Sequence, residues 1–277
     1  MLLFRTVTAP DPCRGLARLA LVVGLLLAVA APSRAADLTP AALAAFAAQF
    51  DHSSQALTEH IERPPVGSEA ERMGVRAGAT LLRPATGDGI IEAPGGLIHN
   101  WRGAIFIPKV TLDQVVEVSR RYPDYPDIFG PITGAKVLVD DGTALVVQFR
   151  MKQSAGGMSA TLDLRSRIRY VRHDARHVYS VSVTEDVHEI KDAGKPTERP
   201  IEPGKDHGYL WRAGSFSRFI AGDGGVYMEM ETIALSRPFP PMLGWFIEPI
   251  ARRLGQRSVE RSMVEFRQAV LMRYAAE

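Results

Sequence analysis

Six consecutive segments in which apolar and polar residues alternate constrain the fold of this chain more than any other feature. They span residues 132–139, 143–152, 158–172, 178–190, 208–221 and 226–235. A period of two residues puts successive side chains on opposite faces of an extended chain, so each segment is expected to be a β-strand. Because most of the connections are short, the sequence predicts an antiparallel sheet in which consecutive strands are neighbours.

Two of the connections contain the Asp-Gly pair, within residues 140–143 and 222–225. Asp-Gly is the strongest short signal for a two-residue hairpin turn, because both turn positions take a positive φ. The connection 191–207 differs from these, since it is polar and contains three prolines. It is too long for a tight turn, and we expect it to form an exposed flap.

Further elements are expected before and after these six strands. Residues 97–107 read as a seventh strand, and two short helices follow, the first capped by Thr111 or Asp113 and the second ending near Phe129. A proline-rich stretch then leads from the last strand into a long C-terminal helix with one apolar side. The apolar positions of that helix include Trp245, Phe246, Ile250, Val259, Met263, Phe266 and Val270.

The chain before residue 97 is organised differently. Residues 40–63 are rich in alanine, with apolar side chains at helical intervals, and predict a helix or a broken helix that ends at a pair of prolines. Residues 66–96 are rich in Gly and Pro and read as a connector. The short apolar pieces 79–82 and 89–91 are expected to pair as a small hairpin, and the connector is also able to donate an extra strand to the sheet.

The N-terminus has the layout of a signal peptide. Three arginines precede an uncharged run of 13 residues, 19–31, and Ser33 and Ala35 supply small side chains for cleavage after Ala35. The run is shorter than the roughly 20 residues of a spanning helix. We therefore expect a mature chain that starts at residue 36 and is exported to the periplasm or secreted.

Removal of residues 1–35 changes what charge and cysteine content imply. Four arginines and one aspartate would be lost, so the formal charge of +2 would become −1 and gives no support to nucleic-acid binding. The single cysteine, Cys13, would be lost as well. The mature chain would then have no thiol nucleophile, disulfide or cysteine metal site. With 46% hydrophobic residues, the 277-residue chain is rich enough in apolar side chains to fold around an ordinary core.

This order of elements resembles the helix-grip fold of the START-like (SRPBCC) superfamily, which includes Bet v 1-like proteins and aromatic polyketide cyclases. The stretches "GLIHNWRGAIFIP", "RRYPDYPDIFGPI" and "GYLWRAGSFSRFIAGDGGVYMEMETIALSR" are similar to exported bacterial members. The resemblance implies an α+β fold with a seven-stranded curved antiparallel sheet wrapped around a long C-terminal helix. The expected organisation is a signal peptide at 1–35, a helical extension and connector at 36–96, and a START-like ligand-binding domain at 97–277.

The resemblance also implies an elongated cavity between the sheet and the C-terminal helix, which would hold a lipid-like or aromatic molecule. In the last hairpin we expect Trp211, Phe219, Met228 and Met230 to face inward and the charged residues to face outward. Tyr125 and Phe129 lie where the superfamily has the helical lid of its cavity, with core packing as the alternative. The predicted cavity lining consists of Trp101, Tyr125, Phe129, Phe149, Leu164, Tyr170, Trp211, Met228, Met230 and Phe266.

Charged residues of the last hairpin allow two interpretations. Counting outward from the Asp223-Gly224 turn places Arg218 opposite Glu229 and the neighbouring Glu231 on the same face. These side chains form either a charge ladder on the solvent face or a site in which Arg212 and Arg218 hold a carboxylate or phosphate head group. The sequence leaves both open.

Candidates for catalysis and for metal binding are weak. His99, Glu229 and Glu231 would be the acid–base groups of a cyclase or dehydratase, although nothing in the sequence brings them together. His173, Asp174 and His177 have a spacing that is compatible with a metal near a turn, but such spacing is common by chance. We therefore predict no metal and no cofactor, and assign no catalytic residue.

The function expected from the sequence is an exported protein that binds a hydrophobic or amphipathic small molecule. One alternative is a cyclase- or dehydratase-type enzyme that uses the same cavity. Another is a structural module that docks a partner or makes transient contact with an anionic membrane through its first and last helices. The identity of the ligand and the oligomeric state are not encoded in any recognisable motif.

Overall fold

The computed structural model describes residues 38–64, 66–155, 158–202, 204–238 and 244–274. The chain divides into two compact units, Met1–Ala35 and Ala36–Glu277. All described residues belong to the second unit. The predicted signal peptide lies outside the described residues. In the described part of the chain, no helix combines the length and the apolar character needed to cross a membrane.

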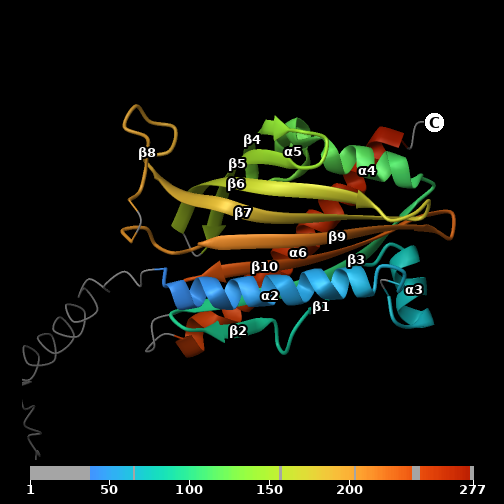
Figure 1. Ribbon diagram of the computed structural model, residues 1–277, viewed down its shortest axis with the longest axis horizontal. Coiled ribbons are helices and arrows are strands. Elements are labelled where there is room, and N and C mark those ends of the chain that lie inside the picture. The colour runs from blue at the N-terminus through green and yellow to red at the C-terminus, as the bar shows by residue number, and fades with distance from the viewer. Residues whose placement is uncertain (1–37, 65, 156–157, 203, 239–243, 275–277) are drawn as a thin grey trace, which may run out of the picture. The chain divides into compact units, whose positions relative to one another are not determined.

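One antiparallel sheet forms the centre of this unit (Figure 1). Its main strands follow the order β1-β3-β10-β9-β7-β6-β5-β4, while β2 pairs with β3 and β8 pairs with β7. The strands are β1 (Leu81–Pro84), β2 (Ile90–Ala93), β3 (Gly96–Pro108), β4 (Ile132–Asp140), β5 (Leu145–Ala155), β6 (Met158–Arg172), β7 (His177–Lys191), β8 (Arg199–Pro200), β9 (Arg212–Gly222) and β10 (Gly225–Ser236). The seven predicted strands are all present, and the three short additional ones raise the total to ten.

The helices lie on both faces of the sheet. They are α2 (Pro40–Glu59), α3 (Glu69–Arg76), α4 (Leu112–Arg120), the 3-10 turn η1 (Tyr122–Asp124), α5 (Tyr125–Ile128) and α6 (Gly244–Tyr274). Figure 1 shows α2 lying across the near face of the sheet and α6 passing behind it. The order of strand, two short helices, six strands and long helix confirms the predicted helix-grip architecture.

Local sequence signals account for most element boundaries. The Thr111 hydroxyl accepts from the backbone N–H of Gln114, whose side chain accepts from the backbone N–H of Thr111, and this capping box starts α4. Thr39 caps α2 and Pro40 occupies its first turn. The β9–β10 hairpin has the predicted two-residue turn, because Asp223 and Gly224 both take a positive φ.

Two predictions about connections are wrong in detail, one helix was not predicted, and the connector does add strands to the sheet, as the sequence allowed. The β4–β5 connection is a four-residue loop, in which the Asp141 carboxylate accepts from the backbone N–H groups of Thr143 and Ala144. The pieces predicted to form a small hairpin pair instead with two different parts of β3, as strands β1 and β2. The connector also contains α3, which Ser68 and Glu71 start with a capping box that the sequence analysis overlooked.

The face of the sheet that packs on α4 and α6 is called the inner face. Its apolar cluster joins Ile105 and Ile107 of β3 and Phe219 of β9 to Met263 and Phe266 of α6. Gly103 of β3 lets α6 approach closely, since a Cβ at this position would lie 2.5 Å from the Met263 sulfur. Four of the predicted apolar positions of the C-terminal helix are therefore buried against the sheet: Val259, Met263, Phe266 and Val270. The side chains of Trp245, Phe246 and Ile250 lie outside the described residues.

The opposite, outer face is covered over β9 and β10 by α2. Phe46 and Leu57 of α2 pack on Phe216, Ile233 and neighbouring apolar side chains of these strands. Further along the same face, Val66 and Val75 of the connector pack on Phe106 and Tyr227. The extension before residue 97 is consequently part of the core, and both faces of the central strands are buried.

Candidate functional site

One end of the inner face is completely filled by side chains. Ile105, Ile107, Val226 and Met263 have no exposed surface, so no space large enough for water adjoins them. Trp101, Met228 and Phe266, which were predicted to line a ligand cavity, belong to this filled cluster and are almost completely buried. In this structure the C-terminal half of α6 packs on these side chains, so they line no open space, and their assignment to a ligand cavity stays a prediction.

Trp101 retains one unsatisfied group inside this cluster. Its indole nitrogen has no hydrogen-bond partner among the described residues, and a Cβ on Gly255 of α6 would lie 2.9 Å from it. Gly255 thus allows the indole to pack against the helix backbone. A buried donor without an acceptor is rare in folded proteins.

The remaining part of the inner face is lined by small hydroxyl side chains. The strand register places Ser180 of β7 beside Ser217 of β9, and Ser182 beside Ser215. These residues lie on the inner side because Val178 and Phe219, the next pair with the same orientation, belong to the cluster under α6. We call Ser180, Ser182, Thr184, Ser215, Ser217 and Thr232 the hydroxyl row.

Part of the hydroxyl row remains accessible although it faces the interior of the fold. Ser180 and Thr184 are buried, whereas Ser182, Ser215 and Ser217 are partly exposed. The Thr184 hydroxyl accepts from the backbone N–H of Ala213 at 2.9 Å. In the described part of the chain, no hydrogen bond engages the hydroxyls of Ser182, Ser215 or Ser217, so each can donate and accept one.

Three tyrosines hold the helical segment after β3 against the inner face. The hydroxyls of Tyr125 and Tyr170 both donate to the backbone carbonyl of Ser119, at 2.7 and 2.8 Å. The hydroxyl of Tyr122 lies 2.9 Å from that of Tyr170. Burial raises the pKa of all three phenols above the ordinary value, which keeps them neutral. They position the segment and have no tendency to act as acids.

Several predicted cavity residues surround these tyrosines. The ring of Tyr125 lies 4.8 Å from that of Phe129 and 6.0 Å from that of Phe149, and all three are half-buried. Leu164 pairs with Phe149 across β5 and β6 and is buried. Met230 of β10 is half-buried at the edge of the filled cluster. The structure therefore brings these predicted residues to the same face as the hydroxyl row.

Five predicted residues lie on the outer face instead. Trp211 departs from the expected alternation and packs with Phe46 and Ile233 under α2. The cross-strand partner of Arg212, Leu235, also belongs to that cluster, and Arg218, Glu229 and Glu231 share this orientation. The placement of Trp211 on the cavity wall is therefore wrong, and neither arginine is placed to hold a head group on the inner face.

The predicted pairs Arg218–Glu229 and Phe216–Glu231 are present in the register. The expectation that this charge ladder faces solvent is wrong, because α2 covers it. The Arg218 guanidinium lies 3.0 Å from Glu229 and donates to backbone carbonyls at the end of α2, including Ile61 at 3.3 Å and Arg63 at 3.1 Å.

Glu231 lies in a second polar group under α2. Its carboxylate accepts from Ser53 of α2 at 2.6 Å, from Asn100 at 2.9 Å and from Arg102. Burial opposes ionisation of Glu231, but the hydrogen bonds from Asn100 and Ser53 and the charge of Arg102 outweigh burial, so the pKa lies below the ordinary value. The carboxylate is thus structural and joins α2 to β3 and β10.

His99 does not meet the glutamates with which the sequence analysis grouped it. It lies on the inner side of β3, where its Nε2 is 3.0 Å from the Ser236 hydroxyl. Burial lowers the pKa of this imidazole and favours its neutral form. Glu229 and Glu231 lie on the opposite face of the sheet, so the acid–base group of the enzymatic alternative is not assembled from these residues.

The β7 part of the hydroxyl row was not predicted from the sequence. In "VYSVSVT" (178–184) the apolar residues Tyr179, Val181 and Val183 would by the usual rule face inward, yet they pack in the cluster under α2. Alternation alone does not show which of two covered faces packs on α6 and which packs on α2. The Ser-x-Ser-x-Thr pattern of β7, together with Ser-x-Ser in β9, is the signal that was available.

No protein-family model and no curated protein matches this chain. Among solved structures, it is similar to TTHA0849 from Thermus thermophilus (12% identity, 63% of this chain and 99% of that chain, TM-score 0.44). It is also similar to a STAR-related lipid transfer protein from Xanthomonas axonopodis (17%, 64% and 99%, 0.41). A third is human STARD10 (10%, 76% and 82%, 0.45).

These similarities are distant. They give no indication of the ligand or the activity of this chain, and the START-like fold stands on the order and pairing of its own strands and helices.

Proposed function

We propose that this protein binds an amphipathic small molecule against the accessible part of its inner face. The observation that supports the proposal is the partial exposure of Ser182, Ser215 and Ser217 on the side of the sheet that α6 and the α4–α5 segment cover. Because these hydroxyls are partly exposed, water reaches them in the unliganded protein, and a ligand can replace that water. A bound molecule with oxygen or nitrogen atoms would satisfy these groups.

The same face offers an apolar surface beside the hydroxyl row. Met230, Tyr170 and Phe149 are half-buried there, so a ligand that covers them removes apolar surface from water on both partners. Burial of such surface contributes roughly 25 cal/mol per Å². A ligand with an apolar body and one or more polar atoms would contact both the apolar side chains and the hydroxyl row, and it fits this face better than a purely hydrocarbon molecule.

Binding is favoured over the two other functions that the sequence left open. The enzymatic alternative required His99 to converge with Glu229 or Glu231, and these residues lie on opposite faces of the sheet. The docking alternative used the first and last helices, and in the structure the apolar side of the first of these, α2, is buried on β9 and β10. The filled end of the inner face agrees with that alternative, whereas the partly exposed hydroxyls beside it support binding of a small molecule.

The proposal includes export. The basic N-terminus, the apolar run 19–31 and the small residues before position 36 support removal of the first 35 residues and function in the periplasm or outside the cell.

The test is native mass spectrometry of the protein purified from its own host, followed by organic extraction and identification of the bound compound. The variant Ser217→Phe would fill the accessible part of the inner face, and the matched control Ser159→Phe makes the same change at an exposed position of β6. Met228 is unsuitable for this purpose because it lies in the filled cluster. We expect a stoichiometric ligand in the wild type and in Ser159→Phe, and at least a tenfold loss in Ser217→Phe.

A second readout uses the amphipathic dye 1-anilinonaphthalene-8-sulfonate on protein stripped of ligand. The dye should bind the wild type and the control variant with equal affinity and bind Ser217→Phe at least tenfold more weakly. An empty wild-type protein that also ignores the dye, or equal binding by all three proteins, would contradict the proposal.

A further inference from the structure

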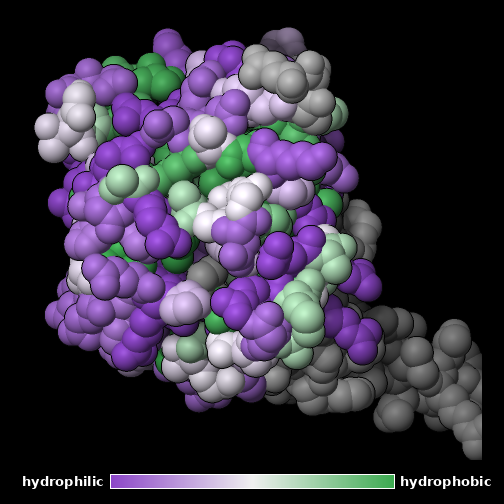
Figure 2. All heavy atoms as spheres, turned by 90° about the vertical axis from the view of Figure 1, so that its right-hand side faces the viewer, coloured by the Kyte–Doolittle hydropathy of each residue, from purple (hydrophilic) through white to green (hydrophobic). Residues whose placement is uncertain are grey.

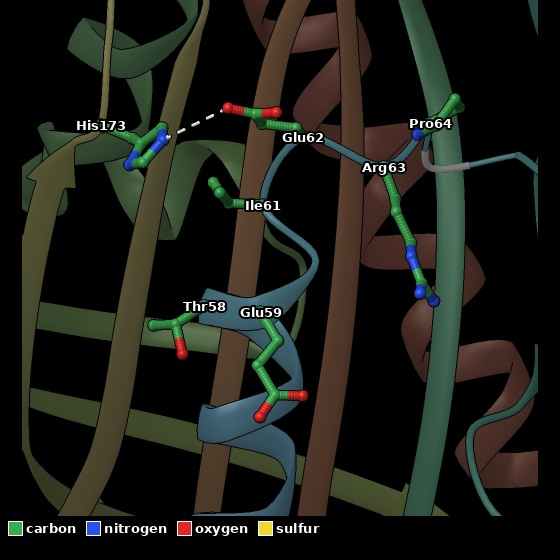
Figure 3. Close-up of a pocket in the computed structure, with 7 residues that line it drawn as sticks. All are labelled: Thr58, Glu59, Ile61, Glu62, Arg63, Pro64 and His173. Carbon is green, nitrogen blue, oxygen red and sulfur yellow. Dashed lines mark ion pairs between the residues drawn. The ribbon is translucent and has the colours of Figure 1, made fainter.

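Three side chains with metal-binding atoms converge on the outer face, where the segment after α2 meets the β6–β7 turn. Glu62 follows α2, and His173 and Asp174 belong to the turn. One ligand atom from each lies within 4.8 Å of the others. Figure 3 shows the Glu62 carboxylate and the His173 imidazole pointing toward one another, with Oε1 and Nε2 3.8 Å apart.

The Asp174 carboxylate is held in place by its own turn. Its Oδ1 accepts from the backbone N–H groups of Arg176 at 2.6 Å and His177 at 2.8 Å. Both oxygens lie 2.9 Å from Nδ1 of His177. Oδ1 therefore has three polar neighbours, whereas Oδ2 has only the His177 ring nitrogen beside it and can accept from a further group.

We propose that Glu62, His173 and Asp174 bind a divalent transition-metal ion of the zinc type. One imidazole and two carboxylates are a ligand set that zinc accepts, with metal–ligand distances of about 2.0–2.2 Å. Two atoms bound at these distances lie roughly 3–4 Å apart, which is the separation already present between Glu62 and His173. Calcium and magnesium prefer all-oxygen ligands and are disfavoured by the imidazole.

The surroundings of the three side chains leave room to complete the coordination. Glu62 and His173 line an open pocket of about 520 Å³, to which Thr58 and Arg63 also contribute. Three protein ligands with an open fourth position are typical of zinc sites that also bind water or an external ligand. Figure 2 shows the end of the molecule on which the β6–β7 turn lies, and hydrophilic side chains cover most of it. Glu62, His173 and Asp174 are all exposed, so water and dissolved ions reach this site directly.

The site would join two segments that are far apart in the sequence. Arg218 already ties the carbonyls of Ile61 and Arg63 to the sheet, and a metal on Glu62 would attach the same segment to the β6–β7 turn. Bound metal should therefore stabilise the docked position of the end of α2. This inference is independent of ligand binding, because the hydroxyl row lies on the opposite face of the sheet.

The test is titration of the untagged full-length protein, first treated with EDTA, with ZnCl₂ by isothermal calorimetry. We expect one zinc ion per chain, and at least tenfold weaker binding in His173→Ala and in Glu62→Gln. The matched control is His188→Ala, since His188 is similarly exposed but faces a single carboxylate, that of Asp186. CoCl₂ gives a second readout, because its visible absorption changes when an imidazole enters the coordination sphere.

A rise in melting temperature with ZnCl₂ in the wild type and in His188→Ala, absent in His173→Ala, would support the site. Unchanged far-UV circular dichroism and metal-free melting temperature of His173→Ala would show that the variant folds. The absence of stoichiometric binding, equal binding by His173→Ala, or equally effective competition by MgCl₂ would overturn the proposal.

Discussion

Replacing Arg218 by methionine removes the guanidinium that joins the end of α2 to the sheet. The side chain is 6% exposed and its partner Glu229 is 12% exposed. Methionine keeps most of the apolar stem and its packing, so the variant mainly tests the polar contacts. The change removes the cation that contacts Glu229 directly. It also leaves the carbonyls of Ile61 and Arg63 without a donor among the described residues.

The expected loss follows from the burial of the pair. Removing one partner of a buried ion pair destabilises a protein by about 3–5 kcal/mol, because the remaining charge is uncompensated. A domain of ordinary stability has a free energy of unfolding of about 5–15 kcal/mol. Arg218→Met should therefore remove a large fraction of that free energy. The exposed pair Arg167–Glu185 is the internal control, with side chains 55% and 29% exposed, and Arg167→Met should cost less than about 1 kcal/mol.

Urea denaturation followed by tryptophan fluorescence measures both variants against the wild type. The double variant Arg218→Met/Glu229→Met removes both charges, and it should regain part of the loss because no unpaired carboxylate remains. Hydrogen exchange should show the loss of protection concentrated in α2. A cost below about 1 kcal/mol for Arg218→Met, or a double variant less stable than the single one, would refute the view that a buried ion pair docks α2.

Two further predictions concern Glu231 and two glycines. The pKa of Glu231 in the folded protein is depressed. The ionised carboxylate therefore stabilises the fold fully above its pKa in the unfolded chain, about 4.5, and this stabilisation is lost as the pH falls through the lower pKa of the folded protein. Glu231→Gln should therefore melt below the wild type at pH 7, with the difference shrinking as the pH falls below about 4.5; an equal difference at acid pH would contradict this. Gly225→Ala should lower stability by about 1–3 kcal/mol, because its Cβ would lie well inside van der Waals distance of the Ile107 carbonyl oxygen. At Gly74 in α3 an added Cβ meets nothing within 4 Å. Gly74→Ala should therefore raise the free energy of unfolding by about 0.5–1 kcal/mol in the same urea denaturation assay. A Gly74→Ala variant that is less stable than Gly225→Ala would contradict both predictions.

Patterns local in sequence predicted the strands and the last hairpin well. The period of two residues located the seven main strands, and the Asp223-Gly224 turn fixed the register that pairs Arg218 with Glu229. Both signals act through backbone sterics and hydrogen bonds between near neighbours in the chain. The β4–β5 loop departs from its prediction because the Asp141 carboxylate binds two backbone N–H groups and widens the connection.

The candidate site was predicted less well, because its location depends on which face of the sheet is covered by which helix. Residues near Tyr125 and Phe149 were placed on the correct face. Trp211 was not, and Met228 and Trp101 lie in a filled cluster. An alternating strand presents two faces, and the usual rule that the apolar face is the inner one fails when α2 covers the other face with apolar side chains of its own.

The amino-acid sequence by itself determined the secondary structure, the order of strand, short helices, sheet and long helix, and the pairing of the last two strands. The tertiary structure alone decided that the extension before residue 97 packs on the sheet, that the charge ladder is buried, and that hydroxyls face the interior. It also decided that Glu62 meets His173. The reason is physical: periodicity and turn preferences act over a few residues, whereas burial and charge pairing depend on contacts between segments that lie far apart in the chain.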